Sequence, residues 1–192
     1  MVLMIEIREA QSSDVEAIAD AHVAGWRVGY RGLFPDEYLD ADSFDTERRD
    51  GWRKETWRES PRATLLVAVL DAAVVGFGYI GPERVDESER VDDSGKVDGM
   101  PERGEVYAFY LHPSGWGSGA AARLMEDCEA RLRAGGFTDA VLWALRDNPR
   151  ARRFYEKAGW RWTGVNHFWD GPSMPGVAKP EQIGDVQYGR SL

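Results

Sequence analysis

Along the chain, segments whose apolar residues recur every second position, as in strands, alternate with segments whose apolar residues recur every three to four positions, as in helices. Residues 5–8 alternate between apolar and polar side chains, which predicts a first strand. A helix is then predicted from a capping box formed by Ser13 and Glu16. It should end near Tyr30, because Gly32 and Pro35 interrupt the pattern. The apolar and aromatic positions at helical spacing are Val15, Ile18, Ala19, His22 and Trp26.

The following segments predict helices and then a hairpin. Residues 34–60 are rich in charge and predict one short and one longer helix, with Phe44 and Trp52 turned inward. Residues 64–70 and 74–80 are β-prone runs separated by a turn, which predicts a β-hairpin. Residues 82–103 then carry eight acidic and four basic side chains and almost nothing apolar. We expect this acidic insertion to be a solvated, mobile loop.

The second half repeats strand and helix signals. Residues 105–111 predict a strand, three glycines follow, and a helix should carry Leu124, Cys128 and Leu132 on its apolar stripe. Residues 138–145 predict another strand. Asn148 and Pro149 predict a helix start, and the tail predicts two strands around a loop at 171–180. This order predicts one α/β domain over residues 1–192, built on a mixed sheet with a strand–glycine loop–helix unit at its centre.

Composition narrows the class of protein. With 33 acidic and 24 basic residues the net charge is −9, which argues against nucleic acids or anionic membranes as partners. The single cysteine, Cys128, cannot form an internal disulfide, and the three histidines lack zinc-ligand spacing. The longest apolar run, residues 65–70, is far too short to span a membrane. We therefore expect a cytoplasmic protein that needs no metal.

The glycine loop at residues 115–119 is the main candidate for ligand binding. Free N–H groups at the start of a helix can bind a phosphate or pyrophosphate, and glycine lets the backbone approach the anion. A glycine-rich turn without a ligand is the alternative. Residues 117–122 also fit the dinucleotide pattern G-x-G-x-x-G/A, but the loop lies in mid-chain and lacks the acidic residue about 20 positions later. No Lys-Ser or Lys-Thr follows the glycines, which excludes a Walker loop.

Three segments together resemble the GCN5-related N-acetyltransferase (GNAT) family. They are EVYAFYLHP at 105–113, WGSGAA at 116–121 and NPRARRFYEKAGW at 148–160, and the resemblance covers about residues 64–162. The resemblance implies a GNAT-type, mostly antiparallel mixed sheet with acetyl-CoA as co-substrate and no metal. Trp116 stands where this family usually has Gln or Arg, which we expect to alter cofactor affinity modestly.

The resemblance also implies where acetyl-CoA binds. The strand 105–111 should separate from the strand 138–145, so that pantetheine pairs with freed backbone groups and the pyrophosphate lies on the loop amides. Asn148 should both cap its helix and contact the cofactor. The implied cofactor residues are Phe109, Tyr110, Leu111, Trp116, Gly117, Ser118, Gly119, Ala120, Ala121, Ala122 and Asn148.

Two residues match the family's catalytic positions. Tyr155 matches the proton donor to the departing thiolate, although a core aromatic would give the same pattern. Glu105 matches the strand glutamate that acts as a base, often through water, and should share a face with Tyr107 and Phe109. An ordinary solvated edge glutamate is the alternative for Glu105.

The acceptor should contact the first helix, through Trp26, Tyr30 or Arg31. The leading hypothesis is an N-acetyltransferase that moves acetyl directly to a primary amine of a small molecule or peptide in a ternary complex. A non-catalytic acyl-CoA sensor on the same fold is the alternative, and a dinucleotide oxidoreductase is a third reading. The strand at residues 186–188 could pair within the chain or across a homodimer.

Overall fold

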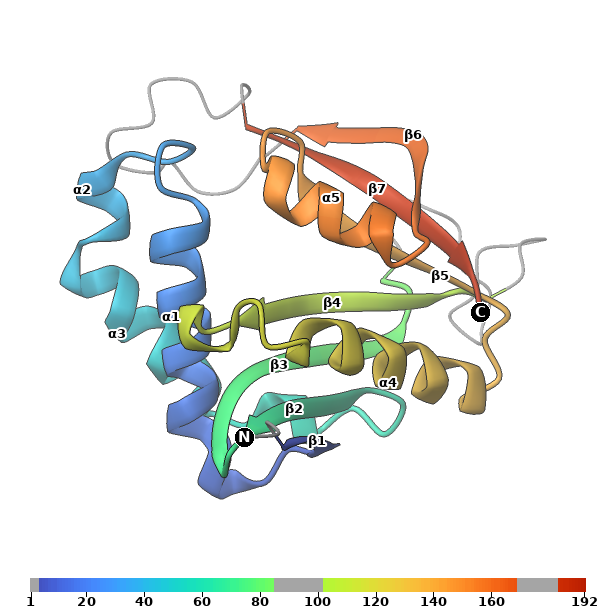
Figure 1. Cartoon of the computed structure of the whole chain (residues 1–192), viewed down its shortest axis with the longest axis horizontal. Helices are drawn as coiled ribbons and strands as arrows, with labels where there is room; N and C mark the ends of the chain where they lie inside the picture. The colour runs from blue at the N-terminus through green and yellow to red at the C-terminus, as the bar shows by residue number, and fades with distance from the viewer. Residues whose placement is uncertain (1–3, 85–101, 169–182) are drawn as a thin grey trace.

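The computed structural model describes residues 4–84, 102–168 and 183–192 (Figure 1). Most of the predicted acidic insertion and the predicted loop at 171–180 therefore lie outside the described residues. Within the described ranges, no helix combines the length and the apolar character needed to cross a bilayer. The same ranges contain no cluster of side chains able to hold a metal ion.

The described strands form one mixed sheet in the order β1-β2-β3-β4-β5-β7-β6. Neighbouring strands are antiparallel except β4 and β5, which are parallel. The C-terminal strand β7 therefore pairs within the chain, with β5 on one side and β6 on the other. The strands are β1 (Ile5–Glu9), β2 (Thr64–Leu70), β3 (Ala73–Pro82), β4 (Gly104–Leu111), β5 (Asp139–Leu145), β6 (Arg161–Phe168) and β7 (Gly184–Ser191).

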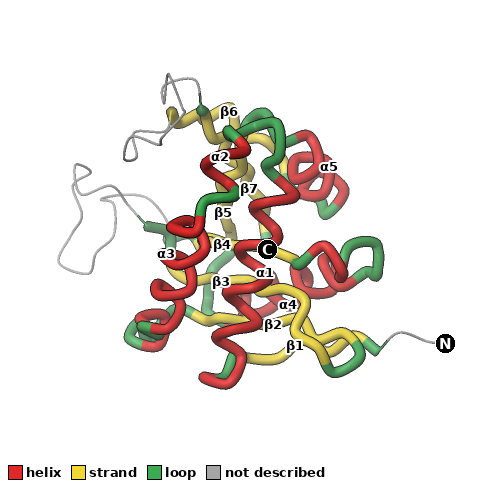
Figure 2. The backbone as a smooth tube through the Cα atoms, turned by 90° about the vertical axis from the view of Figure 1, so that its left-hand side faces the viewer, coloured by secondary structure: helices red, strands yellow, loops and turns green. Residues whose placement is uncertain are grey.

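Helices cover both faces of the sheet. On β3, Phe77 contacts His22 of α1 while its neighbour Gly78 faces Cys128 of α4, so α1 and α4 pack on opposite faces. Figure 2 shows α3 lying along α1, and Figure 1 shows α4 beside the β1–β4 half and α5 beside β5 and β7. The helices are α1 (Val15–Gly29), α2 (Asp36–Leu39), α3 (Asp42–Arg53), α4 (Ala120–Ala134) and α5 (Pro149–Lys157).

Of the two helix starts predicted from capping residues, the one at α1 is wrong and the one at α5 is confirmed. Ser13 lies inside a 3₁₀ turn, Ser12–Asp14, and does not cap α1. The Asp14 carboxylate instead accepts the Gln11 N–H at 2.8 Å and pairs with Arg8 at 2.6 Å. This buried aspartate anchors the turn, so the expected Ser13–Glu16 box is wrong. At α5 the Asn148 cap is confirmed, because Asn148 Oδ1 accepts the Ala151 N–H at 3.1 Å.

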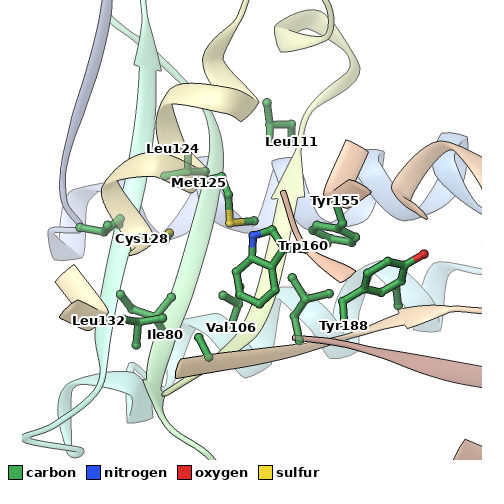
Figure 3. Packing of buried hydrophobic residues seen from close by; sticks show 14 of the residues in the cluster. Ile80, Val106, Leu111, Leu124, Met125, Cys128, Leu132, Tyr155, Trp160 and Tyr188 are labelled. Atoms are coloured by element: carbon green, nitrogen blue, oxygen red, sulfur yellow. The ribbon is translucent and has the colours of Figure 1, made fainter. Parts of the chain in front are cut away.

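The α4 stripe forms the centre of the main core. Leu124, Cys128 and Leu132 are buried there with Tyr155 and Trp160 (Figure 3). A Cβ at Gly78 would lie 2.5 Å from Cys128 Sγ, so this position needs glycine for α4 to approach β3. Burial raises the pKa of the Cys128 thiol. Cys128 is therefore a packing residue, as predicted.

A bulge in β4 sets the geometry of the centre of the sheet. Ala108 pairs with Tyr79 and Val106 pairs with Ile80, which leaves Tyr107 as the extra residue in β4. The bulge bends β4, and its pairing with β5 stops at Val106 and Leu142. Beyond that point the two parallel strands separate, as the resemblance implied. The β5-facing edge of β4 after Val106 therefore has no partner strand among the described residues.

Candidate active site

A cavity of about 300 Å³ fills the space where β4 and β5 separate. We call it the wedge cavity. Gly25 and Gly29 of α1 form part of its wall, and a Cβ at Gly25 would lie 3.1 Å from the Leu111 carbonyl oxygen. Gly25 therefore lets α1 approach the end of β4, whereas a Cβ at Gly29 would meet no other atom within 4 Å. The other lining residues are Tyr30, Val106, Tyr107, Ala108, Phe109, Tyr110, Leu111, Gly115, Trp116, Gly117, Gly119, Ala121, Trp143, Ala144, Leu145, Asn148, Arg150, Ala151, Phe154 and Tyr155.

The glycine loop and the first turn of α4 carry free N–H groups, and Gly117 and Ala121 line this cavity. Gly117 and Gly119 have φ values of +78° and +92°, a region that favours glycine. No side chain caps α4, and Arg123 makes its first intrahelical bond to the Gly119 carbonyl. Within the described residues, the N–H groups of Gly117, Ala121 and Ala122 have no acceptor. Their arrangement at a 15-residue helix start suits a phosphate group.

The ring of Trp116 stacks on the guanidinium of Arg150 beside the same loop. Its indole N–H donates to the Leu111 carbonyl oxygen at 3.2 Å, which fixes the ring against the end of β4. The Arg150 guanidinium carbon lies 3.3 Å from the centroid of this ring. Because Trp116 and Arg150 both line the wedge cavity, the stacked pair places a positive charge near the free amides.

Tyr155 of α5 packs with the buried side chains of the core (Figure 3). It also lines the wedge cavity. Its ring packs against Phe154 and Phe109, with centroid distances of 5.4 and 6.5 Å. Its hydroxyl forms no hydrogen bond with any described residue. Burial, with a smaller contribution from Tyr110, raises the pKa of Tyr155. The phenol is therefore protonated at neutral pH, which is the form required of an acid.

A second cavity, of about 550 Å³, adjoins the first and carries a ring of aromatic side chains. We call it the aromatic cavity. Trp26 lies 4.5 Å from Tyr30 and 5.5 Å from Phe34 between ring centroids. The two cavities share five lining residues, Tyr30, Tyr107, Tyr110, Trp143 and Leu145. The remaining lining residues of the aromatic cavity are Trp26, Phe34, Arg84, Glu105, His167 and Asp185.

Glu105 lies on the wall of the aromatic cavity, and its carboxylate is already paired. It is 2% exposed, and its oxygens accept the Arg84 N–H at 2.8 Å and pair with the Arg84 Nη2 at 2.5 Å. It is therefore not a solvated edge residue. It shares the cavity with Tyr107 as predicted, but the bulge turns Phe109 to the α4 face, so that part of the face prediction is wrong.

Asp185 is the second carboxylate of the aromatic cavity. Its side-chain oxygens form neither a hydrogen bond nor an ion pair with any described residue. Burial raises the pKa of Asp185, and His167 opposes that shift. Its charge in turn raises the pKa values of Tyr30 and Tyr110, after the larger effect of their burial. Asp185 lines the aromatic cavity together with these two tyrosines.

Several residues named from the sequence lie outside these walls. The Ser118 hydroxyl donates to the Gly115 carbonyl oxygen at 2.7 Å and accepts the Ala120 N–H, so it braces the loop. Ala120 is fully buried and Ala122 is exposed. Arg31 pairs with Asp36 at 3.1 Å and with Asp40 at 2.8 Å and lines neither cavity. Trp26 and Tyr30 do line the aromatic cavity.

Sequence reasoning did not identify three features of the walls. Gly25 and Gly29 lie on one face of α1 at a spacing of four, and Gly25 allows the close approach to Leu111. Arg150 lies within the motif at 148–160, but nothing in the sequence indicates that its guanidinium stacks on Trp116. Asp185 enters the site only because β7 pairs beside β5, opposite Leu145.

Comparison with known proteins assigns the class. The family model "Acetyltransferase (GNAT) family" matches residues 27–160. The chain therefore belongs to the GNAT family and is an acetyl-CoA-dependent acyltransferase. It is 30% identical over 146 residues to the uncharacterized N-acetyltransferase YuaI of Bacillus subtilis (strain 168), an alignment that covers 76% of this chain and 75% of YuaI.

Solved structures share the fold. The PaiA N-acetyltransferase of Thermoplasma acidophilum, crystallised with coenzyme A, superposes with a TM-score of 0.69 at 18% identity and covers 98% of this chain and 99% of its own. The putative acetyltransferase YncA of Salmonella typhimurium, crystallised with acetyl-CoA, has a TM-score of 0.64 at 17% identity, with 98% and 94% covered.

Proposed function

We propose that this protein transfers the acetyl group of acetyl-CoA directly to a primary amine of a small molecule or peptide, with both substrates bound together. The observation that carries the proposal is the junction of the two cavities at Tyr30, Tyr107 and Tyr110. A thioester in the wedge cavity and an amine in the aromatic cavity would meet there. Direct transfer needs this arrangement, because the reactants must be held within bonding reach.

The wedge cavity has the groups that acetyl-CoA requires. The free amides at the start of α4, with Arg150 beside them, suit the pyrophosphate. The unpaired edge of β4 after Val106 offers backbone groups to pantetheine. The cavity walls also include Phe109, Tyr110, Leu111 and Asn148, four residues for which we propose cofactor contacts.

Tyr155 is the residue we propose as the acid. The amine nitrogen attacks the thioester carbonyl carbon, the carbon–sulfur bond breaks, and the Tyr155 hydroxyl gives its proton to the sulfur. The product amide then loses the extra proton from its nitrogen, which restores the phenol. We propose that Glu105 removes the proton of the substrate ammonium group before the attack. It does so through a water molecule, because its carboxylate is already paired with Arg84.

A panel of amines tests the proposed activity. The purified protein is mixed with acetyl-CoA and with polyamines, amino acids, aminoglycosides and short peptides, and free thiol release is measured. Thiol release that depends on a primary amine supports the proposal. Saturable coenzyme A binding without thiol release on any amine would contradict it and would favour a non-catalytic acyl-CoA sensor.

A further inference from the structure

Among the described residues, the aromatic cavity contains one carboxylate without a partner. Two of its charged side chains, Glu105 and Arg84, neutralise each other through an ion pair of 2.5 Å, and the Arg84 backbone N–H donates a further hydrogen bond of 2.8 Å to the same carboxylate. The Asp185 carboxylate makes no hydrogen bond or ion pair with a described residue, and the other titratable groups that line the cavity are His167, Tyr30, Tyr107 and Tyr110. A partly buried carboxylate without a partner is costly, so it favours a positively charged ligand.

The surrounding rings favour the same kind of ligand. Trp26, Tyr30 and Phe34 form a continuous aromatic wall, with neighbouring centroids 4.5 to 5.7 Å apart. Trp143 adds another ring and contacts His167 at 6.1 Å between centroids. Aromatic faces attract organic cations, most strongly where water is excluded. The back of this cluster already holds one cation, because the Arg48 guanidinium lies 4.5 Å from the Trp26 ring.

Asp185 also lies to one side of the junction of the cavities. Asp185, His167 and Phe34 line the aromatic cavity alone, whereas Tyr30, Tyr110 and Leu145 line both cavities. When the amine of the acceptor reacts at the junction, Asp185 is therefore available to bind another part of the same acceptor molecule. A ligand with one positive charge at the reacting nitrogen and a second charge further along would satisfy both places.

We propose that the acceptor carries a second positive charge apart from the nitrogen that is acetylated, and that Asp185 with the aromatic wall of Trp26, Tyr30 and Phe34 binds it. This inference rests on the proposed function and names its acceptor class as a diamine, or an amine with a distal cationic group. Asp185 is then the residue that determines specificity for such acceptors.

The test is calorimetric binding to the protein–coenzyme A complex, which does not depend on turnover. The probes are unbranched α,ω-diamines of three to six carbons, each compared with the monoamine of the same chain length. We expect the best diamine to bind at least about tenfold more tightly than its monoamine. Asp185→Asn should reduce this preference to less than about threefold, while Asp185→Glu should retain most of it. Glu37→Gln removes the same charge from an exposed position on α2 and should leave the preference unchanged.

Two results would overturn the proposal. One is equal affinity of the natural protein for diamines and monoamines throughout the series. The other is an equal loss for both ligands in Asp185→Asn, with urea unfolding showing that the variant is folded. Thiol release, measured in parallel, reports separately on the proposed function: monoamine turnover without diamine preference refutes only the Asp185 assignment, and diamine binding without any turnover refutes only the proposed transferase activity.

Discussion

Replacement of Tyr155 by phenylalanine should separate catalysis from stability. The substitution removes one oxygen atom from a side chain that is 7% exposed. Because that hydroxyl has no hydrogen-bond partner among the described residues, its loss leaves no buried group unsatisfied there. The free energy of unfolding should therefore change by less than about 1 kcal/mol. The packing against Phe109 and Phe154 remains.

The effect on the reaction should be much larger. A positioned acid typically contributes about 10²- to 10⁴-fold to the rate, which corresponds to about 3–5 kcal/mol of transition-state stabilisation. We expect kcat for thiol release with the best amine to fall by that factor, with little change in the KM for acetyl-CoA. Urea unfolding of the same preparation gives the stability, and the two measurements together define the role.

Tyr188→Phe is the matched control. The Tyr188 hydroxyl accepts from Arg152 at 3.0 Å and donates to Glu156 at 2.9 Å, and the residue lines neither cavity. This variant should lose about 1–3 kcal/mol of stability and keep kcat within about threefold. A Tyr155→Phe protein that turns over at the natural rate, or one that loses activity only because it unfolds, would refute the acid assignment.

Three further predictions follow from the site and the core. Arg150→Gln should raise the Kd for coenzyme A by about 10-fold or more. Arg153→Gln changes an exposed neighbour on α5 and should leave this Kd unchanged. An Arg150→Gln protein with the Kd of the natural protein would show that Arg150 does not bind the cofactor. Glu105→Gln should lower turnover and alter its pH profile, and an unchanged profile would remove Glu105 from the reaction. Burial lowers the pKa of His22 to about 3, so the unfolded chain binds more protons below pH 6.5 and stability falls as the pH falls. Between pH 7 and 5 this loss should be about 2 kcal/mol by urea unfolding, and His22→Asn should remove most of it; an equal pH dependence in both proteins would contradict the assignment.

The fold was largely predictable because its signals are local. The helical stripe of Leu124, Cys128 and Leu132 and the cap at Asn148 each follow from spacing within one segment. The start of α1 was mispredicted because Asp14 takes its partners from Arg8, on the preceding strand, and from the Gln11 backbone. Contacts of that kind depend on how the elements meet.

The site was predictable where it follows the family motifs and less so elsewhere. Tyr155, Gly117 and Asn148 were identified by position, and all three line the wedge cavity. The pairing of Glu105 with Arg84 joins residues 21 apart across the ends of β3 and β4, and no periodicity reports it. Asp185 lies at the start of β7, far from every motif. Its place in the aromatic cavity follows from the pairing of β7 with β5.

The central claim is that acetyl-CoA and the amine occupy the two joined cavities at the same time. An initial-rate matrix that varies both substrates tests it most directly. Direct transfer predicts double-reciprocal lines that intersect. Cys128 is fully buried, and burial raises the pKa of its thiol, so it is not expected to carry an acetyl group. Parallel lines, together with an acetylated protein isolated in the absence of amine, would contradict the account.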